Sequence, residues 1–172
     1  MKIKIFPFFL VIFFLSIFFI FYKGLKNSNI YTPEVSVEKK IPSFSAKLFD
    51  TNNEISSDEI FKSEKFYLMN IWASWCLPCR KEHNFLMYLS KKKNLEIVGL
   101  NYKDNSQNAQ NFLNELGNPF KISFTDKDGT IAIEWGAYGV PETFLIYDKK
   151  IIKKIIGPLN KDLITEIKEI IE

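Results

Sequence analysis

Cysteine and histidine are scarce in this chain, and their scarcity argues against several kinds of site. The 172 residues include two cysteines, Cys76 and Cys79, and one histidine, His83. A structural zinc site needs four ligands, usually two cysteine pairs or cysteines combined with histidines, so we expect no metal site. Covalent haem attachment requires a histidine directly after the second cysteine, where this chain has Arg80. The sequence therefore predicts neither a metal nor another cofactor.

An excess of charge of either sign is also missing from most of the chain. Basic residues number 23 and acidic residues 20, which gives a formal net charge of +3. Four lysines, Lys2, Lys4, Lys23 and Lys26, precede the first acidic residue, so the remainder holds 19 basic and 20 acidic residues. Proteins that bind nucleic acid usually carry a basic patch or stripe. The sequence therefore indicates no nucleic-acid partner.

One long apolar run is present, at residues 5–22, and only Pro7 and Ser16 interrupt it. A helix of that length spans about 27 Å, close to the hydrocarbon core of a bilayer at roughly 30 Å. A secretory signal has a shorter apolar region that ends in small residues, whereas Lys23 follows the run here. Residues 1–22 are therefore predicted to be an uncleaved transmembrane anchor, with a cleaved signal peptide as the alternative.

The lysines that flank the apolar run bear on its orientation. Two lysines and the amino terminus precede the run and two lysines follow it, a slight bias that favours an inside amino terminus. The rest of the chain would then lie outside, where disulfide chemistry is expected. Residues 23–40 are polar without an apolar period and are predicted to be a linker. Residues 41–172 are numerous enough for one well-buried domain.

Apolar periodicity and turn residues predict the elements of this domain. Strands buried on both faces are expected at 66–72 and 95–101, because both runs are apolar without alternation. A helix at 80–91 joins them into a βαβ unit. The other expected elements are a β extension at 42–49 and 54–60, helices at 106–116, 131–135 and 161–171, and strands at 120–125, 143–147 and 151–156. This order predicts an α/β fold, a mixed sheet with helices on both faces.

The two cysteines lie between the strand predicted at 66–72 and the helix predicted at 80–91. A Cys-x-x-Cys pair at such a junction is typical of a thioredoxin-like redox site. Unpaired amide groups and the positive end of the helix dipole stabilise a thiolate at Cys76. We therefore expect Cys76 to attack a partner disulfide and Cys79, one turn deeper, to resolve the mixed disulfide. The alternative is a static disulfide, which would stabilise little because its loop is very short.

Three more residues near these motifs are candidates for a role. Glu82 shares a helical face with apolar residues, where burial would raise its pKa and make it a proton shuttle for Cys79. The alternative is an exposed Glu82 that complements the helix dipole. The next residue, His83, is expected to be exposed to solvent. A proline that opens a strand is usually trans, so Pro141 by itself predicts a simple bend.

Three motifs occur in an order and at separations that match a known family. They are Trp72-Ala-Ser-Trp-Cys-Leu-Pro-Cys79, Asn101-Tyr-Lys-Asp104 and Tyr138-Gly-Val-Pro-Glu-Thr-Phe-Leu-Ile146. In its anchor and from Ile41 to the C-terminus, the sequence resembles the membrane-anchored thiol:disulfide interchange proteins of bacterial cytochrome c maturation, the CcmG or DsbE type of the thioredoxin superfamily. Many redox proteins share Cys-x-x-Cys, whereas the other two motifs are more selective.

The resemblance implies a thioredoxin-like fold with an N-terminal β extension and a central insert. It also implies a single-pass protein of the bacterial inner membrane with its soluble domain in the periplasm. The implied reaction is reduction of the haem-attachment cysteines of apocytochrome c, or of a mixed disulfide with its maturation chaperone. A membrane thiol reductase would be the electron donor. The alternatives are another membrane-tethered thioredoxin-like reductant with different exported substrates, and a non-catalytic scaffold that binds a peptide.

The resemblance also assigns roles by position. It makes Cys76 the attacking thiol and Cys79 the resolving thiol of a redox-active disulfide, and it matches Glu82 to a buried acid. Pro141 corresponds to a cis-proline beside the thiols. The expected partner-binding residues are Trp75, Val140, Pro141, Glu142 and Thr143. Independently of the resemblance, the two residues between the cysteines offer no cationic group to stabilise a thiolate, which favours a reductive direction.

Overall fold

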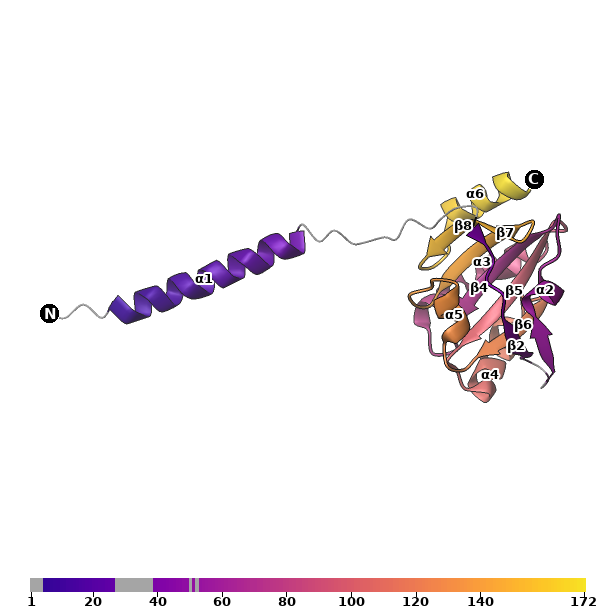
Figure 1. Ribbon diagram of the computed structural model, residues 1–172, viewed down its shortest axis with the longest axis horizontal. Coiled ribbons are helices and arrows are strands. Elements are labelled where there is room, and N and C mark those ends of the chain that lie inside the picture. Colours follow the sequence, from indigo (N-terminus) through magenta and orange to yellow (C-terminus); the bar gives the residue numbers. More distant parts are fainter. Residues whose placement is uncertain (1–4, 27–38, 50, 52) are drawn as a thin grey trace. The chain divides into compact units, whose positions relative to one another are not determined.

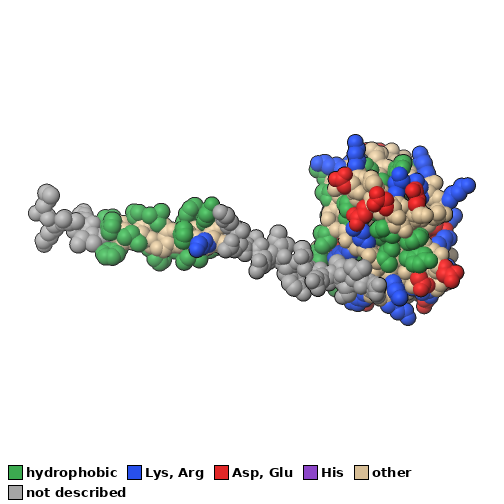
Figure 2. Space-filling view, turned by 90° about the horizontal axis from the view of Figure 1, so that it is seen from above, with side chains coloured by type: hydrophobic (Ala, Val, Ile, Leu, Met, Phe, Trp, Pro, Cys, Tyr) green, Lys and Arg blue, Asp and Glu red, His purple; other side chains and the backbone are tan. Residues whose placement is uncertain are grey.

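The computed structural model describes residues 5–26, 39–49, 51 and 53–172. The chain divides into two compact units, Met1–Glu34 and Val35–Glu172, and each is described by itself. In the first unit, helix α1 (Ile5–Lys26) displays hydrophobic side chains along its length (Figure 2). Its window Pro7–Gly24 has a mean hydropathy of 2.0, so by length and composition α1 is suited to crossing a membrane.

The segment expected to be a linker, 23–40, contains regular structure at both ends. Residues 23–26 belong to α1, and Lys39 and Lys40 form a short strand, β1, that pairs antiparallel with β8. Residues 27–38 lie outside the described residues. The domain therefore begins with an ordered strand slightly before the boundary expected at residue 41.

The second unit is built on a mixed sheet, which in the described part of the chain has the strand order β1-β8-β7-β4-β5-β6-β2-β3 (Figure 1). Strands β4, β5 and β6 run parallel, and the other neighbouring pairs are antiparallel. The strands are β1 (Lys39–Lys40), β2 (Ser45–Leu48), β3 (Glu54–Ser56), β4 (Phe66–Trp72), β5 (Leu95–Tyr102), β6 (Ile122–Asp126), β7 (Glu142–Tyr147) and β8 (Lys150–Ile156). The helices are α2 (Ser57–Ile60), α3 (Leu77–Leu89), α4 (Ser106–Leu116), α5 (Thr130–Glu134) and α6 (Lys161–Ile171).

Strand β4 lies inside the sheet and is covered on both faces. Because successive side chains of a strand point to opposite faces, Leu68 and Trp72 join an apolar cluster with α3, α4 and α6. Tyr67, Met69 and Ile71 join a second cluster with residues of α2 and α5. This two-sided burial accounts for the unbroken apolar run that predicted a central strand.

Of residues 54–60, predicted as part of the β extension, only 54–56 form a strand, and the chain then forms the short helix α2. Ser56 caps this helix, because its Oγ accepts the Glu59 N–H at 3.3 Å while Glu59 Oε2 accepts the Ser56 N–H at 2.8 Å. Such a capping box satisfies donors of the first helical turn and favours helix over strand. The hairpin of β2 and β3 remains as the N-terminal β extension, and β2 joins β6.

The sheet brings three segments to one edge, where β4 and β5 end. Helix α3 starts shortly after Trp72, and the loop after β5 lies beside it because Trp72 pairs with Asn101. The loop before β7 reaches the same edge, since antiparallel β7 begins with Glu142 opposite Ile71. Ligands of open α/β sheets commonly bind at the carboxyl ends of the parallel strands. On the face of the domain seen in Figure 2, basic and acidic side chains are interspersed and neither charge forms a large patch.

Candidate active site

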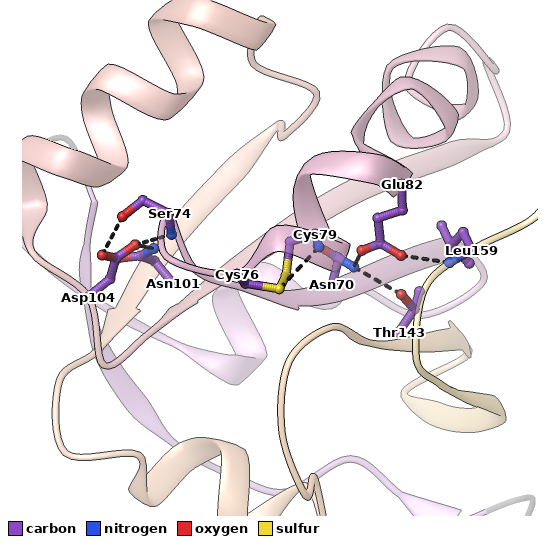
Figure 3. The surroundings of a disulfide bond; sticks show 9 residues. All are labelled: Asn70, Ser74, Cys76, Cys79, Glu82, Asn101, Asp104, Thr143 and Leu159. Atoms are coloured by element: carbon purple, nitrogen blue, oxygen red, sulfur yellow. Dashed lines mark hydrogen bonds between the residues drawn. A yellow bond between two sulfur atoms is a disulfide. The ribbon is translucent and has the colours of Figure 1, made fainter.

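The two cysteines are joined by a disulfide at this edge of the sheet (Figure 3). Cys76 is the N-cap of α3, and its Sγ accepts the Cys79 N–H at 3.1 Å. Pro78 lies in the first turn of α3, where a missing N–H leaves no helical hydrogen bond unmade. The helix therefore begins at Leu77, three residues before the start predicted from the sequence.

The two cysteines differ more in their position relative to α3 than in their exposure. Cys76 is 3% exposed and Cys79 is 2% exposed, a difference too small to assign the attacking thiol. At the helix end, however, Cys76 Sγ lies where amide groups and the helix dipole favour a thiolate. Cys79 lies one turn further in. The geometry therefore favours Cys76 as the nucleophile.

Glu82 is buried, so the alternative of an exposed residue in the first helical turn is wrong. Its Oε1 accepts a hydrogen bond from Asn70 Nδ2 at 2.9 Å, and its Oε2 accepts one from the Leu159 N–H at 2.7 Å (Figure 3). Burial raises the pKa of Glu82 from 4.5 to about 7, although both hydrogen bonds act to lower it. A carboxyl group that titrates near neutrality can accept and return a proton at physiological pH.

Asn70 is a buried polar residue of β4 that sequence reasoning missed. Its Nδ2 donates to Glu82 Oε1 at 2.9 Å and to Thr143 Oγ1 at 3.0 Å, so it links α3 to the start of β7. Buried amides need hydrogen-bond partners. The signal that could have found this link is a lone asparagine inside the apolar run 66–72.

The peptide bond between Val140 and Pro141 is cis, as the family resemblance implied and the local pattern alone did not. Val140 packs against both apolar clusters of the domain. The loop that carries this bond lies beside the start of α3, because β7 pairs with β4. The structure thus brings the cis-proline to the same edge of the sheet as the disulfide.

Glu142 and Thr143 were expected to face a partner, but their side chains are only 1% and 0% exposed. Glu142 Oε1 accepts the N–H groups of Tyr138 at 2.6 Å and Gly139 at 3.1 Å. Its Oε2 lies 2.9 Å from Lys154 Nζ, in a buried ion pair. The Glu142 side chain therefore supports the loop from inside the domain, and Thr143 Oγ1 accepts the hydrogen bond from Asn70.

The loop after β5 holds the segment that precedes Cys76. Asp104 accepts hydrogen bonds from both the main chain and the side chain of Ser74. Trp75 Nε1 donates to the Lys103 carbonyl at 3.1 Å, which fixes an indole that is 58% exposed beside the disulfide. Sequence reasoning used residues 101–104 only as a family motif and missed these contacts.

His83 was predicted to be exposed, and this prediction is wrong, because the residue is only 2% exposed. Its Nε2 donates to the Gly117 carbonyl at 2.9 Å, and its ring meets Phe112 edge to face with centroids 5.1 Å apart. Burial lowers the pKa of His83, so its neutral form is favoured. Helix α4 covers this side of α3, a tertiary contact that helical spacing does not reveal.

Solved structures share this fold. The thioredoxin domain of a thiol-disulfide oxidoreductase from Bacteroides vulgatus matches with a TM-score of 0.68 at 18% identity, covering 81% of this chain and 100% of that domain. At this identity the likeness shows the fold alone. With a Cys-x-x-Cys disulfide at the start of the helix after β4, the fold and the site define a thioredoxin-like thiol:disulfide oxidoreductase.

Comparison of sequences identifies the family. The Redoxin family model matches residues 36–170, and thiol:disulfide interchange protein DsbE of Tatumella citrea is 42% identical over 128 residues, 74% of this chain and 69% of that protein. DsbE of Escherichia coli (strain K12) is 40% identical over 125 residues, 72% of this chain and 67% of that protein. The chain therefore belongs to the Redoxin family, among the DsbE-type thiol:disulfide interchange proteins.

Proposed function

We propose that this protein is a membrane-tethered reductase that keeps the haem-attachment cysteines of apocytochrome c in the thiol state. Its direct target is either those cysteines or a mixed disulfide between them and a maturation chaperone. The observation that carries the proposal is the Cys76–Cys79 pair at the start of α3, with the buried carboxyl of Glu82 one turn further along. The cytochrome c substrate is supported by the three sequence motifs that resemble the cytochrome c maturation proteins.

The reaction starts from the reduced protein. The Cys76 thiolate attacks one sulfur of the partner disulfide, forms a mixed disulfide, and displaces the second partner sulfur as a thiolate that takes up a proton. Glu82 accepts the proton of the Cys79 thiol, and the resulting thiolate attacks Cys76 Sγ and displaces the first partner sulfur. That sulfur also takes up a proton, so the partner gains two electrons and two protons and this protein becomes the disulfide.

Recognition of the partner is assigned to the surface around the disulfide. Trp75 and Leu77 flank Cys76 and are 58% and 64% exposed, so they offer apolar area to a partner. On the other side, the Val140 main chain ahead of the cis-Pro141 bond would pair with an extended partner segment. Glu142 supports this loop from the interior.

The proposed location is the bacterial inner membrane, with α1 as a single-pass anchor and the domain in the periplasm. The length and hydropathy of α1 and the slight excess of positive charge before it support this arrangement. A membrane thiol reductase would then return two electrons to the Cys76–Cys79 disulfide after each cycle. The proposed organisation is an anchor at 1–22, a linker at 23–40 and a thioredoxin-like domain at 41–172. Helix α1 continues to Lys26, and strand β1 adds Lys39 and Lys40 to the domain.

The substrate can be tested with the full-length reduced protein in detergent. We expect it to reduce an oxidised Cys-x-x-Cys-His peptide about tenfold faster than the same peptide with alanine for histidine, a difference of about 1.4 kcal/mol in activation free energy. Thiol release during the first turnover is the measurement. Equal rates for both peptides and for insulin would favour the alternative, a membrane-tethered reductant with other exported substrates.

The direction of electron flow is tested by the reduction potential of the same preparation, equilibrated with glutathione buffers. We expect a value near that of reducing thioredoxins, about −270 mV, because no cation stabilises the thiolate from between the cysteines. A value near about −120 mV, which is typical of strong disulfide oxidants, would show that the protein accepts electrons from its partner.

A further inference from the structure

We propose that Asp104 is a positioning residue for thiol exchange. Its carboxylate fastens the segment before Cys76 to the loop after β5 and so keeps the Cys76 sulfur over the N-terminus of α3. The inference rests on Cys76 being the attacking thiol of the proposed function, but it does not depend on which protein is the substrate.

The two oxygens of Asp104 accept four hydrogen bonds. Figure 3 shows those from Ser74 and Asn101. Ser74 contributes two of them, from its N–H to Oδ2 at 2.5 Å and from its Oγ to Oδ1 at 2.7 Å. The other two come from Asn101 Nδ2 to Oδ2 at 3.0 Å and from the Asn105 N–H to Oδ1 at 2.8 Å. Asp104 is thus held from its own loop while it holds Ser74, two residues before Cys76.

A second contact joins the same two segments. Trp75 Nε1 donates to the Lys103 carbonyl at 3.1 Å. Lys103 has φ of 44°, a left-handed conformation that is uncommon for residues other than glycine. Its N–H donates to the Asp126 carbonyl at 2.9 Å, which ties the loop to the sheet. An uncommon backbone conformation that surrounding contacts hold in place often marks a functional constraint.

This fixation matters most when the disulfide is open. In the oxidised protein, the bond to Cys79 itself keeps Cys76 Sγ on the helix. In the reduced protein that bond is gone, and the thiolate gains from the helix amides only if the Cys76 main chain stays in its N-cap conformation, with φ −85° and ψ 104°. The Cys76 N–H donates to the Ala73 carbonyl at 3.2 Å, so this conformation continues the turn that Asp104 holds at Ser74.

The charge of Asp104 and its positioning role predict shifts of opposite sign. A nearby negative charge disfavours a thiolate, so on electrostatic grounds alone removal of Asp104 would lower the pKa of the Cys76 thiol. If Asp104 positions Cys76, its removal takes the sulfur away from the helix amides and raises that pKa. Other charged groups also lie on neighbouring segments. Helix α3 carries Arg80, Lys81 and Glu82, and Arg80 pairs with Glu115 of α4 at 2.6 Å. Lys103 lies beside Asp104, and Glu142 pairs with Lys154 behind the cis-proline loop.

The experiment measures the rate at which iodoacetamide alkylates Cys76 as a function of pH. It uses the full-length protein in detergent with Cys79→Ser, so that Cys76 is the one reactive thiol of the chain. We expect Asp104→Asn to move the midpoint of the profile up by about one pH unit, which is a tenfold loss of thiolate below the midpoint. Ser74→Ala, which removes one of the four hydrogen bonds without changing charge, should move it up by a smaller amount.

Asp58→Asn is the matched control, because it removes one carboxylate at a place remote from the loop after β5. Asp58 is an exposed residue of α2 that pairs with Lys149 at 2.6 Å, in the turn between β7 and β8 and so at the end of β7 opposite the cis-proline loop. This variant should leave the Cys76 profile unchanged. A downward shift or no shift with Asp104→Asn, or an equal shift with Asp58→Asn, would overturn the inference. If Asp104→Asn does not fold, an unchanged profile with Ser74→Ala would overturn it. An inert Cys76 in the parent protein would instead overturn the proposed function.

Discussion

Replacement of Cys79 with serine is expected to trap the protein in a covalent complex with its partner. Cys76, at the N-terminus of α3, still attacks the partner disulfide, because the helix amides that favour its thiolate are unchanged. The serine hydroxyl cannot displace the partner sulfur, so the mixed disulfide persists and steady-state reduction is abolished. The chain has no other cysteine to resolve the complex.

The matched variant is Cys76→Ser, which retains Cys79 one turn deeper in α3. The Cys79 thiol is not at the N-cap, so we expect its pKa to be about one unit higher than that of Cys76. The thiolate population, and with it the trapped fraction, should then be about tenfold lower. Cells that express each full-length variant are quenched in acid and alkylated, and the complexes are separated on non-reducing gels and identified by mass spectrometry. A trap that forms with Cys76→Ser and not with Cys79→Ser would reverse the assignment of the two thiols.

The order of the elements could be predicted because local patterns specify it. The apolar runs of β4 and β5 are buried on both faces, and Asn105 caps α4 as a short polar side chain commonly does. The Cys-x-x-Cys pair follows a buried strand and opens a helix, a junction that spacing alone reveals. The β extension was predicted only in part, because the capping box of Ser56 and Glu59 competes with extended structure over the same residues.

The environment of the site could not be predicted, because distant segments create it. Helical spacing alone was compatible with either a buried or an exposed Glu82. Its buried position depends on hydrogen bonds from Asn70 and from the Leu159 N–H, which is 77 residues further along the chain. His83 was predicted wrongly for the same reason, since Phe112 of α4 and Gly117, the residue that follows α4, lie against it. Local periodicity shows which side chains share a face but not what lies against that face.

Glu82→Gln is expected to slow the attack of Cys79 on the mixed disulfide by about a hundredfold at neutral pH, the lower range for loss of a general base. With its pKa raised to about 7 by burial, Glu82 is partly ionised at pH 7 and can accept the Cys79 proton. The attack is measured by mixing reduced full-length protein with an aromatic disulfide and following release of the second aromatic thiol. The inflection near pH 7 should disappear in Glu82→Gln and persist in Glu169→Gln, which changes an exposed residue of α6.

The same substitution makes a thermodynamic prediction with a definite sign. Between pH 4.5 and about 7, folded Glu82 keeps a proton that the unfolded chain has released, so its contribution to the free energy of unfolding falls as pH rises. A shift of this size corresponds to about 3 kcal/mol. The other groups titrate alike in both proteins. The free energy of unfolding of Glu82→Gln should therefore rise by about that much, relative to that of the parent, between pH 4 and pH 8. Urea unfolding followed by tryptophan fluorescence measures this difference. If the difference in free energy of unfolding between the two proteins does not change with pH, Glu82 ionises like an exposed carboxyl. If that difference changes with pH but the rate of Cys79 attack is the same in both proteins, Glu82 is buried and takes no part in the proton transfer.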